Sequence, residues 1–130
     1  DPIIEGIHTK MEHLTSIPKE NYESLQLLKY EEGQHYSRHH DYLLYLKDRE
    51  PGVRILTIYM YLNDDGLVGG ETAFPELGIN VTPKAGKIIV WPSVFNADPD
   101  AKDPLTDHEA LTVQAGLKYG ANAWVHQRNY

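Results

Sequence analysis

Residues 53–62 constrain the fold more than any other segment, because β-branched and aromatic side chains recur in them with the two-residue period of a β-strand. The turn-forming sequence Asn-Asp-Asp-Gly at residues 63–66 ends this strand. Alternation predicts that one face carries Ile55, Thr57, Tyr59 and Tyr61, and that the other carries Arg54, Leu56, Ile58, Met60 and Leu62.

Alternation of apolar and polar residues continues through most of the chain, with turn signals between the alternating segments. Further strands are predicted at residues 24–31, 36–41, 70–74, 79–82, 86–91, 109–113 and 119–127. A series of short strands of this kind is typical of a β-sandwich or jelly roll. The predicted fold class is therefore mainly β.

The first residues have a different period. Asp1 is a suitable N-cap, Pro2 suits the first helical position, and the helix would end near Ser16, before Pro18. Its apolar face consists of Ile3, Ile4, Ile7, Met11 and Leu14. The 130 residues form a single domain in this interpretation, and because the chain starts directly on a helix we expect it to lack the N-terminal part of that domain.

Composition excludes several classes of partner and site. Twelve Lys and Arg stand against 19 Asp and Glu, and with no basic run we expect no nucleic-acid partner. No apolar stretch approaches the roughly 20 residues needed to cross a bilayer, so this segment predicts no membrane contact. The absence of cysteine excludes thiolate metal sites, which leaves His, Asp and Glu as ligands. Oligomeric state and cellular location are not assigned by the sequence.

A candidate metal site lies in the predicted strand 36–41. Residues two apart on a strand point to the same side, so His39 and Asp41 can meet at one point while His40 faces away. With His108 as a distant third ligand, they would form the facial triad that holds Fe(II) and leaves coordination positions open. His35 shares the face of His39 and is the alternative third ligand, although its nearness to His39 favours a surface strand histidine instead.

Lys118, ten residues after His108, adds to this interpretation. A 2-oxo diacid that chelates iron through one end has a second carboxylate deeper in a barrel, where a buried Lys or Arg can neutralise it. The alternative is a solvated surface lysine.

A larger set of ordered motifs resembles the catalytic domain of the prolyl 4-hydroxylases over nearly the whole chain. These motifs are Leu28-Lys29-Tyr30-Glu31-Glu32-Gly33-Gln34, His39-His40-Asp41, Arg54-Ile55-Leu56-Thr57, Tyr61-Leu62-Asn63, Gly69-Gly70-Glu71-Thr72-Ala73-Phe74-Pro75, Pro83-Lys84-Ala85-Gly86-Lys87, His108-Glu109-Ala110, Gly116-Leu117-Lys118-Tyr119 and Trp124-Val125-His126. The resemblance implies a double-stranded β-helix, which is a jelly roll, supported by the N-terminal helix. It also implies that His39, Asp41 and His108 bind Fe(II) and that Lys118 pairs with the distal carboxylate of 2-oxoglutarate.

The resemblance implies further site residues. Tyr30 and Thr72 would add hydrogen bonds to the distal carboxylate, whereas without the family they are simply a core tyrosine and a strand threonine. Arg54 and His126 match positions associated with the peptide substrate, and Trp124 is a third candidate because it shares the strand face of His126. Ordinary packing also explains a strand-end arginine and a nearby aromatic residue. The segments 41–53, 64–69 and 96–107 would form loops that close over the peptide.

The activity implied is that of a 2-oxoglutarate-dependent dioxygenase, which hydroxylates a peptidyl proline and converts 2-oxoglutarate and O2 to succinate and CO2. Fe(II) and ascorbate are the other implied cofactors. Two alternatives stay open: a hydroxylase of the same fold acting on a free amino acid or small molecule, and a non-catalytic jelly-roll binding module. A zinc hydrolase is disfavoured, because the chain has no His-Glu-x-x-His motif. The family often has a cysteine after the distal histidine, and this chain has none.

Overall fold

The computed structural model describes residues 1–130 and contains one α-helix, four 3₁₀ helices and ten strands. The helices are α1 (Pro2–Thr15), η1 (Lys19–Asn21), η2 (Leu44–Leu46), η3 (Pro75–Leu77) and η4 (Pro104–Thr106). The strands are β1 (Gln26–Tyr30), β2 (Tyr36–His39), β3 (Arg54–Tyr61), β4 (Val68–Gly69), β5 (Thr72–Phe74), β6 (Ile79–Val81), β7 (Ile88–Pro92), β8 (His108–Ala110), β9 (Val113–Ala115) and β10 (Lys118–His126). None of the helices is long and apolar enough to cross a membrane.

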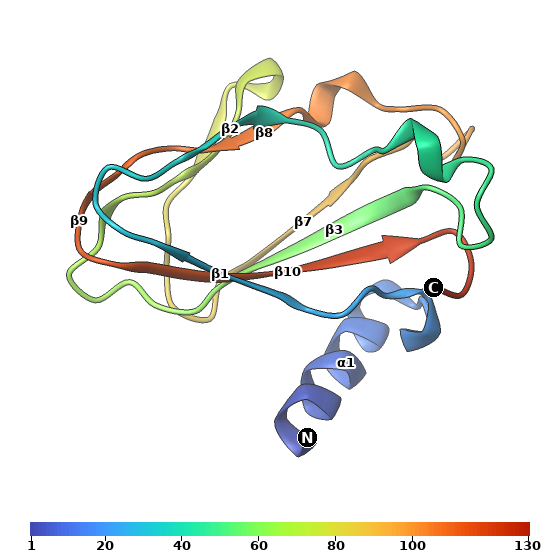
Figure 1. Ribbon diagram of the computed structural model, residues 1–130, viewed down its shortest axis with the longest axis horizontal. Helices are drawn as coiled ribbons and strands as arrows, with labels where there is room; N and C mark the ends of the chain where they lie inside the picture. Colours follow the sequence, from blue (N-terminus) through green and yellow to red (C-terminus); the bar gives the residue numbers. More distant parts are fainter.

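The strands form two facing antiparallel sheets. The major sheet has the order β1-β10-β3-β7, and the minor sheet has the order β2-β8-β5-β6. Figure 1 shows the two sheets as separate layers, joined at one end through the two-stranded β4-β9 ribbon. This arrangement confirms the predicted mainly β jelly roll with an N-terminal helix.

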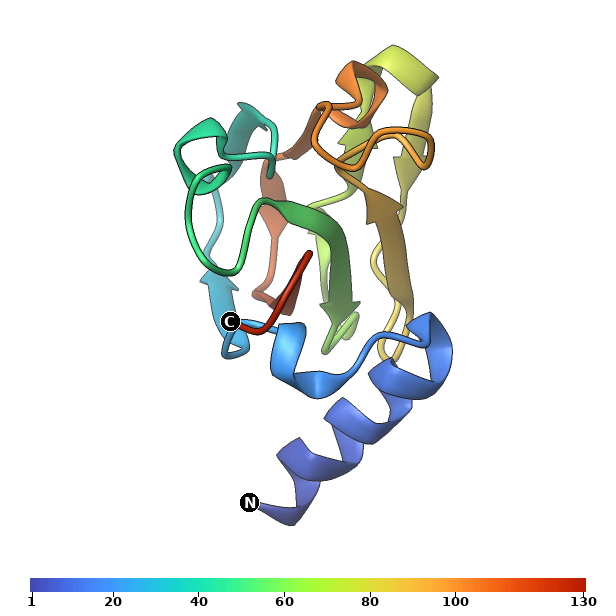
Figure 2. The same cartoon turned by 90° about the vertical axis from the view of Figure 1, so that its right-hand side faces the viewer.

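Helix α1 packs through its C-terminal half against the outer face of the major sheet, away from the space between the sheets, and its N-terminal end projects beyond the barrel (Figure 2). Of the predicted apolar face, Met11 is buried, whereas Ile3, Ile4 and Leu14 are exposed. The Asp1 carboxylate caps its first turn by accepting from the Ile3 N–H at 2.8 Å, and Ser16 ends it in the left-handed conformation. Met11 packs there in an outer cluster with Tyr22, Ile58, Ala123 and Val125. The predicted helix and its boundaries are confirmed.

The space between the sheets is filled mainly by aromatic side chains. Tyr59, Tyr61, Phe74 and Trp91 form this inner cluster, and the Tyr61 hydroxyl lies 2.6 Å from Thr72 Oγ1 on the facing sheet. The Tyr61 and Thr72 side chains therefore tie the two layers together close to the closed end of the barrel.

The predicted strand at residues 109–113 is wrong as a single element. The chain leaves the minor sheet after β8 and enters the β4-β9 ribbon, so that two strands replace one. At the corner, the Leu111 N–H donates to the carbonyl of Glu71, and the carbonyl of Thr112 accepts from the Gly70 N–H. Alternation continues through this corner, which is why the sequence pattern does not reveal it.

A β-bulge changes the face on which Arg54 lies. Leu56 pairs with Val125 and Arg54 pairs with His126, so Ile55 is an extra residue in the β3–β10 ladder. Strict alternation predicts that Arg54 shares the outer face of Leu56. The bulge instead turns Arg54 to the inner face, where it lines the central pocket.

The three loops predicted to close over a substrate lie at opposite ends of the barrel. Residues 41–53 and 96–107 contact each other, because the Tyr42 hydroxyl donates to the Asp100 carbonyl at 2.8 Å. Residues 64–69 lie instead against the turn that precedes β10. The first two loops therefore border the mouth of the barrel, and the third borders its closed end.

Candidate metal centre

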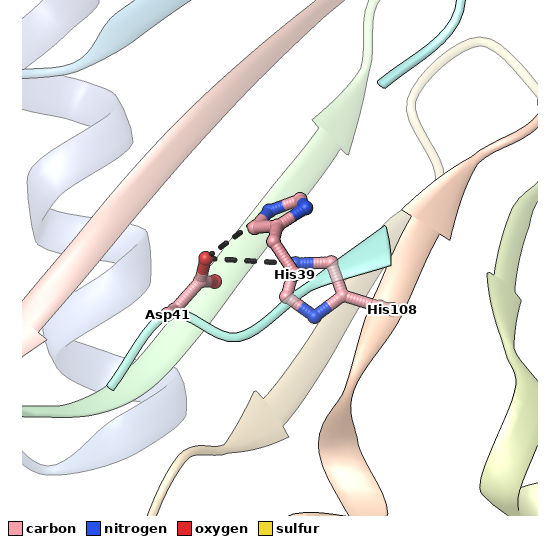
Figure 3. Close-up of side chains that lie close together, drawn as sticks. All are labelled: His39, Asp41 and His108. Carbon is pink, nitrogen blue, oxygen red and sulfur yellow. Dashed lines mark ion pairs between the residues drawn. The ribbon is translucent and has the colours of Figure 1, made fainter. Parts of the chain in front are cut away.

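Two histidines and one aspartate from separate parts of the chain meet at the mouth of the barrel. His39 ends β2 and His108 begins β8, and the two residues are directly paired across the minor sheet. Asp41 follows β2 by two residues and points toward both rings (Figure 3). The structure thus brings together the three residues that the sequence singled out, with possible ligand atoms within 4.8 Å of one another.

The hydrogen bonds of the two rings fix which nitrogen faces the centre. His39 Nδ1 lies 2.8 Å from the Ser37 carbonyl oxygen, and His108 Nδ1 lies 2.9 Å from the Thr106 carbonyl oxygen. A carbonyl oxygen can only accept, so each Nδ1 carries the proton. In the neutral rings, each Nε2 therefore presents a lone pair toward Asp41.

The Asp41 carboxylate completes a set of electron-pair donors. Its Oδ1 lies 3.5 Å from Nε2 of His39 and 3.5 Å from Nε2 of His108, while its Oδ2 accepts from the Thr57 hydroxyl at 2.6 Å. Burial raises its pKa, but the two histidines in their protonated form and the Thr57 hydroxyl outweigh burial and hold the pKa well below its usual range. Two imidazole lone pairs and a carboxylate oxygen converge at the end of the pocket, and a divalent cation fits such a donor set.

The other two histidines of this segment take no part in the cluster. His40 Nε2 lies 2.7 Å from the Asp103 carbonyl oxygen, and its Nδ1 accepts from the Tyr42 N–H. His35 is exposed and lies outside the cluster. The local alternative with His35 as third ligand is therefore not formed.

A pocket of about 310 Å³ extends from these residues between the two sheets. Lys118 lies at its inner end and is only 1% exposed. The Lys118 ammonium forms no hydrogen bond or ion pair and is surrounded by aromatic rings; its Nζ lies 4.9, 5.4 and 5.7 Å from the ring centroids of Tyr30, Tyr59 and Tyr61. Burial lowers its pKa to about 8, and the charge of Glu71, which forms no ion pair with it, opposes this effect only in part. A buried cation without a counter-ion is costly unless an anion binds beside it.

The predicted neighbours Tyr30 and Thr72 also line this pocket. Tyr30 places its ring against the Lys118 ammonium. Thr72 Oγ1 already shares a hydrogen bond with the Tyr61 hydroxyl, and the Tyr61 hydroxyl donates to the Val81 carbonyl at 3.1 Å. Both predicted residues thus line the same pocket as the lysine, and Tyr61 is a neighbour of the lysine that the sequence analysis did not name as a site residue.

The predicted substrate residues form a network at the mouth around Glu23, which the sequence analysis did not single out. Arg54 stacks on the Trp124 ring at 3.9 Å and donates to the Glu23 carboxylate through Nε at 2.7 Å. His126 Nε2 lies 2.7 Å from the same carboxylate, and its Nδ1 lies 2.8 Å from the Gly52 carbonyl oxygen. Arg54 and Trp124 line the pocket, whereas His126 is completely buried behind them.

Burial and hydrogen bonding have opposite effects on the pKa of Glu23. Burial raises its pKa, but hydrogen bonds from His126 and Arg54 outweigh burial and leave the pKa below its ordinary value. The carboxylate is therefore ionised and holds the Arg54 guanidinium in position. No sequence signal marked this glutamate, because its partners lie on strands far away in the chain.

Comparisons with known proteins agree with this geometry. The model of the 2OG-Fe(II) oxygenase superfamily matches residues 25–126. Among curated relatives, prolyl 4-hydroxylase 2 of Arabidopsis thaliana is 36% identical over 97% of this chain and 48% of its own length. Prolyl 4-hydroxylase subunit alpha-1 of Bos taurus is 33% identical over 98% of this chain and 24% of its own length.

Solved structures show the same fold. The 2OG complex of the viral collagen prolyl hydroxylase from Paramecium Bursaria Chlorella virus-1 has a TM-score of 0.79 and 29% identity, over 97% of this chain and 73% of that one. The chain spans about half the length of the plant relatives it matches, and less of the animal subunits. With a matching family model over most of its residues, this chain belongs to the 2OG-Fe(II) oxygenase superfamily.

Proposed function

We propose that this chain is the catalytic core of an Fe(II)- and 2-oxoglutarate-dependent dioxygenase that hydroxylates proline in a peptide. The observation that carries the proposal is the relation between the two ends of one pocket. His39, Asp41 and His108 converge at the mouth, and Lys118 lies without a counter-ion at the inner end. A diacid with a chelating 2-oxo acid group at one end is complementary to both.

The three mouth residues would hold Fe(II) through Nε2 of each histidine and Oδ1 of Asp41. The backbone carbonyls of Ser37 and Thr106 orient the imidazoles, and Thr57 orients the carboxylate. These hydrogen bonds form without a metal, so the three side chains would already be oriented when Fe(II) binds.

Lys118 would bind the distal carboxylate of 2-oxoglutarate, with Tyr30 and Thr72 beside it. When bound, Fe(II), O2 and 2-oxoglutarate supply the oxidising chemistry, in which 2-oxoglutarate yields succinate and CO2 and the substrate C–H bond becomes C–OH. The protein itself positions the reacting groups and excludes water from them. Phe74 and Trp91 pack against the His108 ring, with centroids 5.8 and 4.7 Å away, and keep water from that side.

A peptide substrate is supported by the surface at the mouth and by the relatives, which are named prolyl 4-hydroxylases. The stacked Arg54 and Trp124 form a flat, polar-edged wall, and Glu23 fixes the guanidinium. Beside the mouth, Leu44 and Tyr45 are 70% and 68% exposed, which offers apolar contacts to a chain longer than one amino acid. We assign His126 to holding Glu23 rather than to contact with the peptide. Ascorbate is part of the proposal as the reductant that keeps the iron ferrous.

The test is succinate formation from 2-oxoglutarate with Fe(II) and ascorbate, with and without a proline-rich peptide, for the wild-type chain and for Asp41→Ala. We expect turnover that the peptide stimulates and that the variant lacks. A hydroxylated peptide of increased mass identifies the product. Stimulation by free proline but not by peptide would favour a small-molecule hydroxylase, and the absence of 2-oxoglutarate binding would contradict the proposal.

A further inference from the structure

The Tyr59 side chain carries a polar group that nothing in the protein satisfies. Tyr59 lies on the inner face of β3 and is 6% exposed, and its hydroxyl is buried without a hydrogen-bond partner. Burial raises the pKa of this phenol, so it keeps its proton and remains able to donate. Buried hydroxyls almost always have partners, and an unpaired one inside a pocket points to a ligand.

Gly120 shows where this hydroxyl lies. Gly120 is on β10, two residues after Lys118, so both positions face the pocket. A Cβ at residue 120 would collide with the Tyr59 hydroxyl, which means that the phenol occupies the space of the missing side chain. The hydroxyl therefore lies over β10 next to the position of Lys118, whose Nζ is 5.4 Å from the Tyr59 ring centroid.

The neighbouring Tyr61 provides the contrast. Its hydroxyl is paired with Thr72 Oγ1 at 2.6 Å and donates to the Val81 carbonyl, so its hydrogen-bonding capacity is used within the protein. The two rings meet edge to face with centroids 5.0 Å apart. Of these two tyrosines, Tyr59 alone has a hydroxyl free for a ligand.

We propose that Tyr59, whose phenol fits against the backbone because residue 120 is glycine, is a further hydrogen-bond donor to the distal carboxylate of the co-substrate, in addition to Lys118. The inference rests on the proposed function, because it assumes that a 2-oxo diacid occupies the pocket. A carboxylate has two oxygens and several lone pairs, so an ammonium and a neutral O–H can bind it together. The hydroxyl donates without adding a second buried positive charge. It thereby helps to select a diacid over a monoacid of equal length.

The first experiment measures binding without turnover. Protein loaded with Mn(II) under nitrogen is titrated by calorimetry with 2-oxoglutarate, and separately with 2-oxopentanoate, which has a methyl group in place of the distal carboxylate. For Tyr59→Phe we expect 2-oxoglutarate affinity to fall about tenfold, as for the loss of one hydrogen bond to a charged group. We expect the affinity for 2-oxopentanoate to change less than about twofold, since that ligand makes no such bond.

Each other outcome of the titration has a definite meaning. Unchanged 2-oxoglutarate affinity in Tyr59→Phe, or equal losses for the two ligands, would overturn the role of Tyr59 while leaving the proposed function intact. Failure of the wild-type protein to bind 2-oxoglutarate would overturn both.

Thermal unfolding of the unliganded protein gives an independent readout. Tyr59→Phe removes an unpaired buried hydroxyl and should raise Tm by about 3 °C. Tyr61→Phe is the matched control and should lower Tm, because it breaks the contacts with Thr72 and Val81. Destabilisation of similar size in both variants would mean that the Tyr59 hydroxyl has a partner within the protein, and it would overturn the inference.

Discussion

The two faces of strand β3 differ in whether they carry polar groups that lack a hydrogen-bond partner. On the outer face, Ile58 is completely buried in the apolar cluster under helix α1, with Met11, Tyr22, Ala123 and Val125. On the inner face, the Thr57 and Tyr61 hydroxyls pair with Asp41 and Thr72, whereas the Tyr59 hydroxyl and the nearby Lys118 ammonium have no hydrogen-bond partner in the protein. One strand thus separates a face that stabilises the fold from a face on which one hydroxyl, that of Tyr59, is left for a ligand.

The difference teaches that burial has opposite consequences on the two sides. Burying an apolar group on the outer face stabilises the folded state at about 25 cal/mol per Å². Burying a charge or an unpaired hydroxyl on the inner face costs free energy, which a ligand can recover on binding. Substitutions on the two faces should therefore separate stability from activity.

The largest expected effect is on the inner face. Asp41→Ala removes the carboxylate that both histidines face, and turnover of 2-oxoglutarate should fall more than about a thousandfold because the metal loses a ligand. Circular dichroism should still show a folded protein. Retention of more than a tenth of wild-type turnover would contradict the placement of the metal.

The outer face should respond only in stability. Ile58→Ala leaves a cavity beneath α1 and should lower the free energy of unfolding by about 2–5 kcal/mol, whereas the control Ile58→Val should lower it by about 1 kcal/mol. Urea titration measures both values. At urea concentrations below the unfolding transition, kcat per folded molecule should equal that of the wild type. A large fall in kcat would contradict the prediction that the outer face affects stability alone.

Lys118→Met should stabilise the unliganded protein and at the same time weaken its binding of 2-oxoglutarate. Replacing the buried ammonium with an apolar side chain should stabilise the unliganded protein by about 1–2 kcal/mol. The same change should weaken 2-oxoglutarate binding by about a hundredfold, because the distal carboxylate loses its cation. Calorimetric titration and urea unfolding test the two halves separately, with 2-oxopentanoate as the control ligand.

The pH dependence of binding should follow the same lysine. Its pKa of about 8 lies below the ordinary value of 10.5 because burial disfavours the charge. Only the protonated form binds a carboxylate, so 2-oxoglutarate affinity should fall as pH rises above 8, by about tenfold per unit. The unfolded chain keeps this proton up to about 10.5, so the lysine makes the unliganded protein more stable as pH rises from 8. Lys118→Met should abolish both trends.

The smallest expected effect is at the mouth. Arg54→Lys keeps the charge but loses the planar group that stacks on Trp124 and pairs with Glu23. The peptide KM should rise about fivefold, an effect comparable to one weakened cation–π contact and its hydrogen bonds. 2-Oxoglutarate binding without peptide should be unchanged; a matching loss there would place Arg54 in the co-substrate site.

Local patterns predicted most of this architecture. Helix α1 follows from Asp1, Pro2 and an apolar face, and β3 follows from strict alternation. The division into β8 and β9 and the bulge at Ile55 were missed, because both depend on which strand pairs with which. A pattern along one strand contains no information about its partner.

The candidate site was predictable where residue type and spacing suffice. The His-x-Asp pair, the distant His108 and Lys118 fall in this class, since each has a distinct chemistry. Tyr59 and Glu23 do not, because a strand tyrosine and a loop glutamate are common. Their role depends on neighbours distant in sequence, namely Gly120 beside the phenol and Arg54 beside the carboxylate.

The two ends of the pocket belong to different layers, because the paired histidines are on the minor sheet and Lys118 is on the major sheet. A diacid held at both ends would act as a cross-brace between the layers, next to the existing ties Asp41–Thr57 and Tyr61–Thr72. In the proposed reaction, conversion to succinate would remove the 2-oxo acid end and so release the brace. The length of the co-substrate would then set the gap between the sheets, and the barrel would be stiffest before turnover and loosest after it.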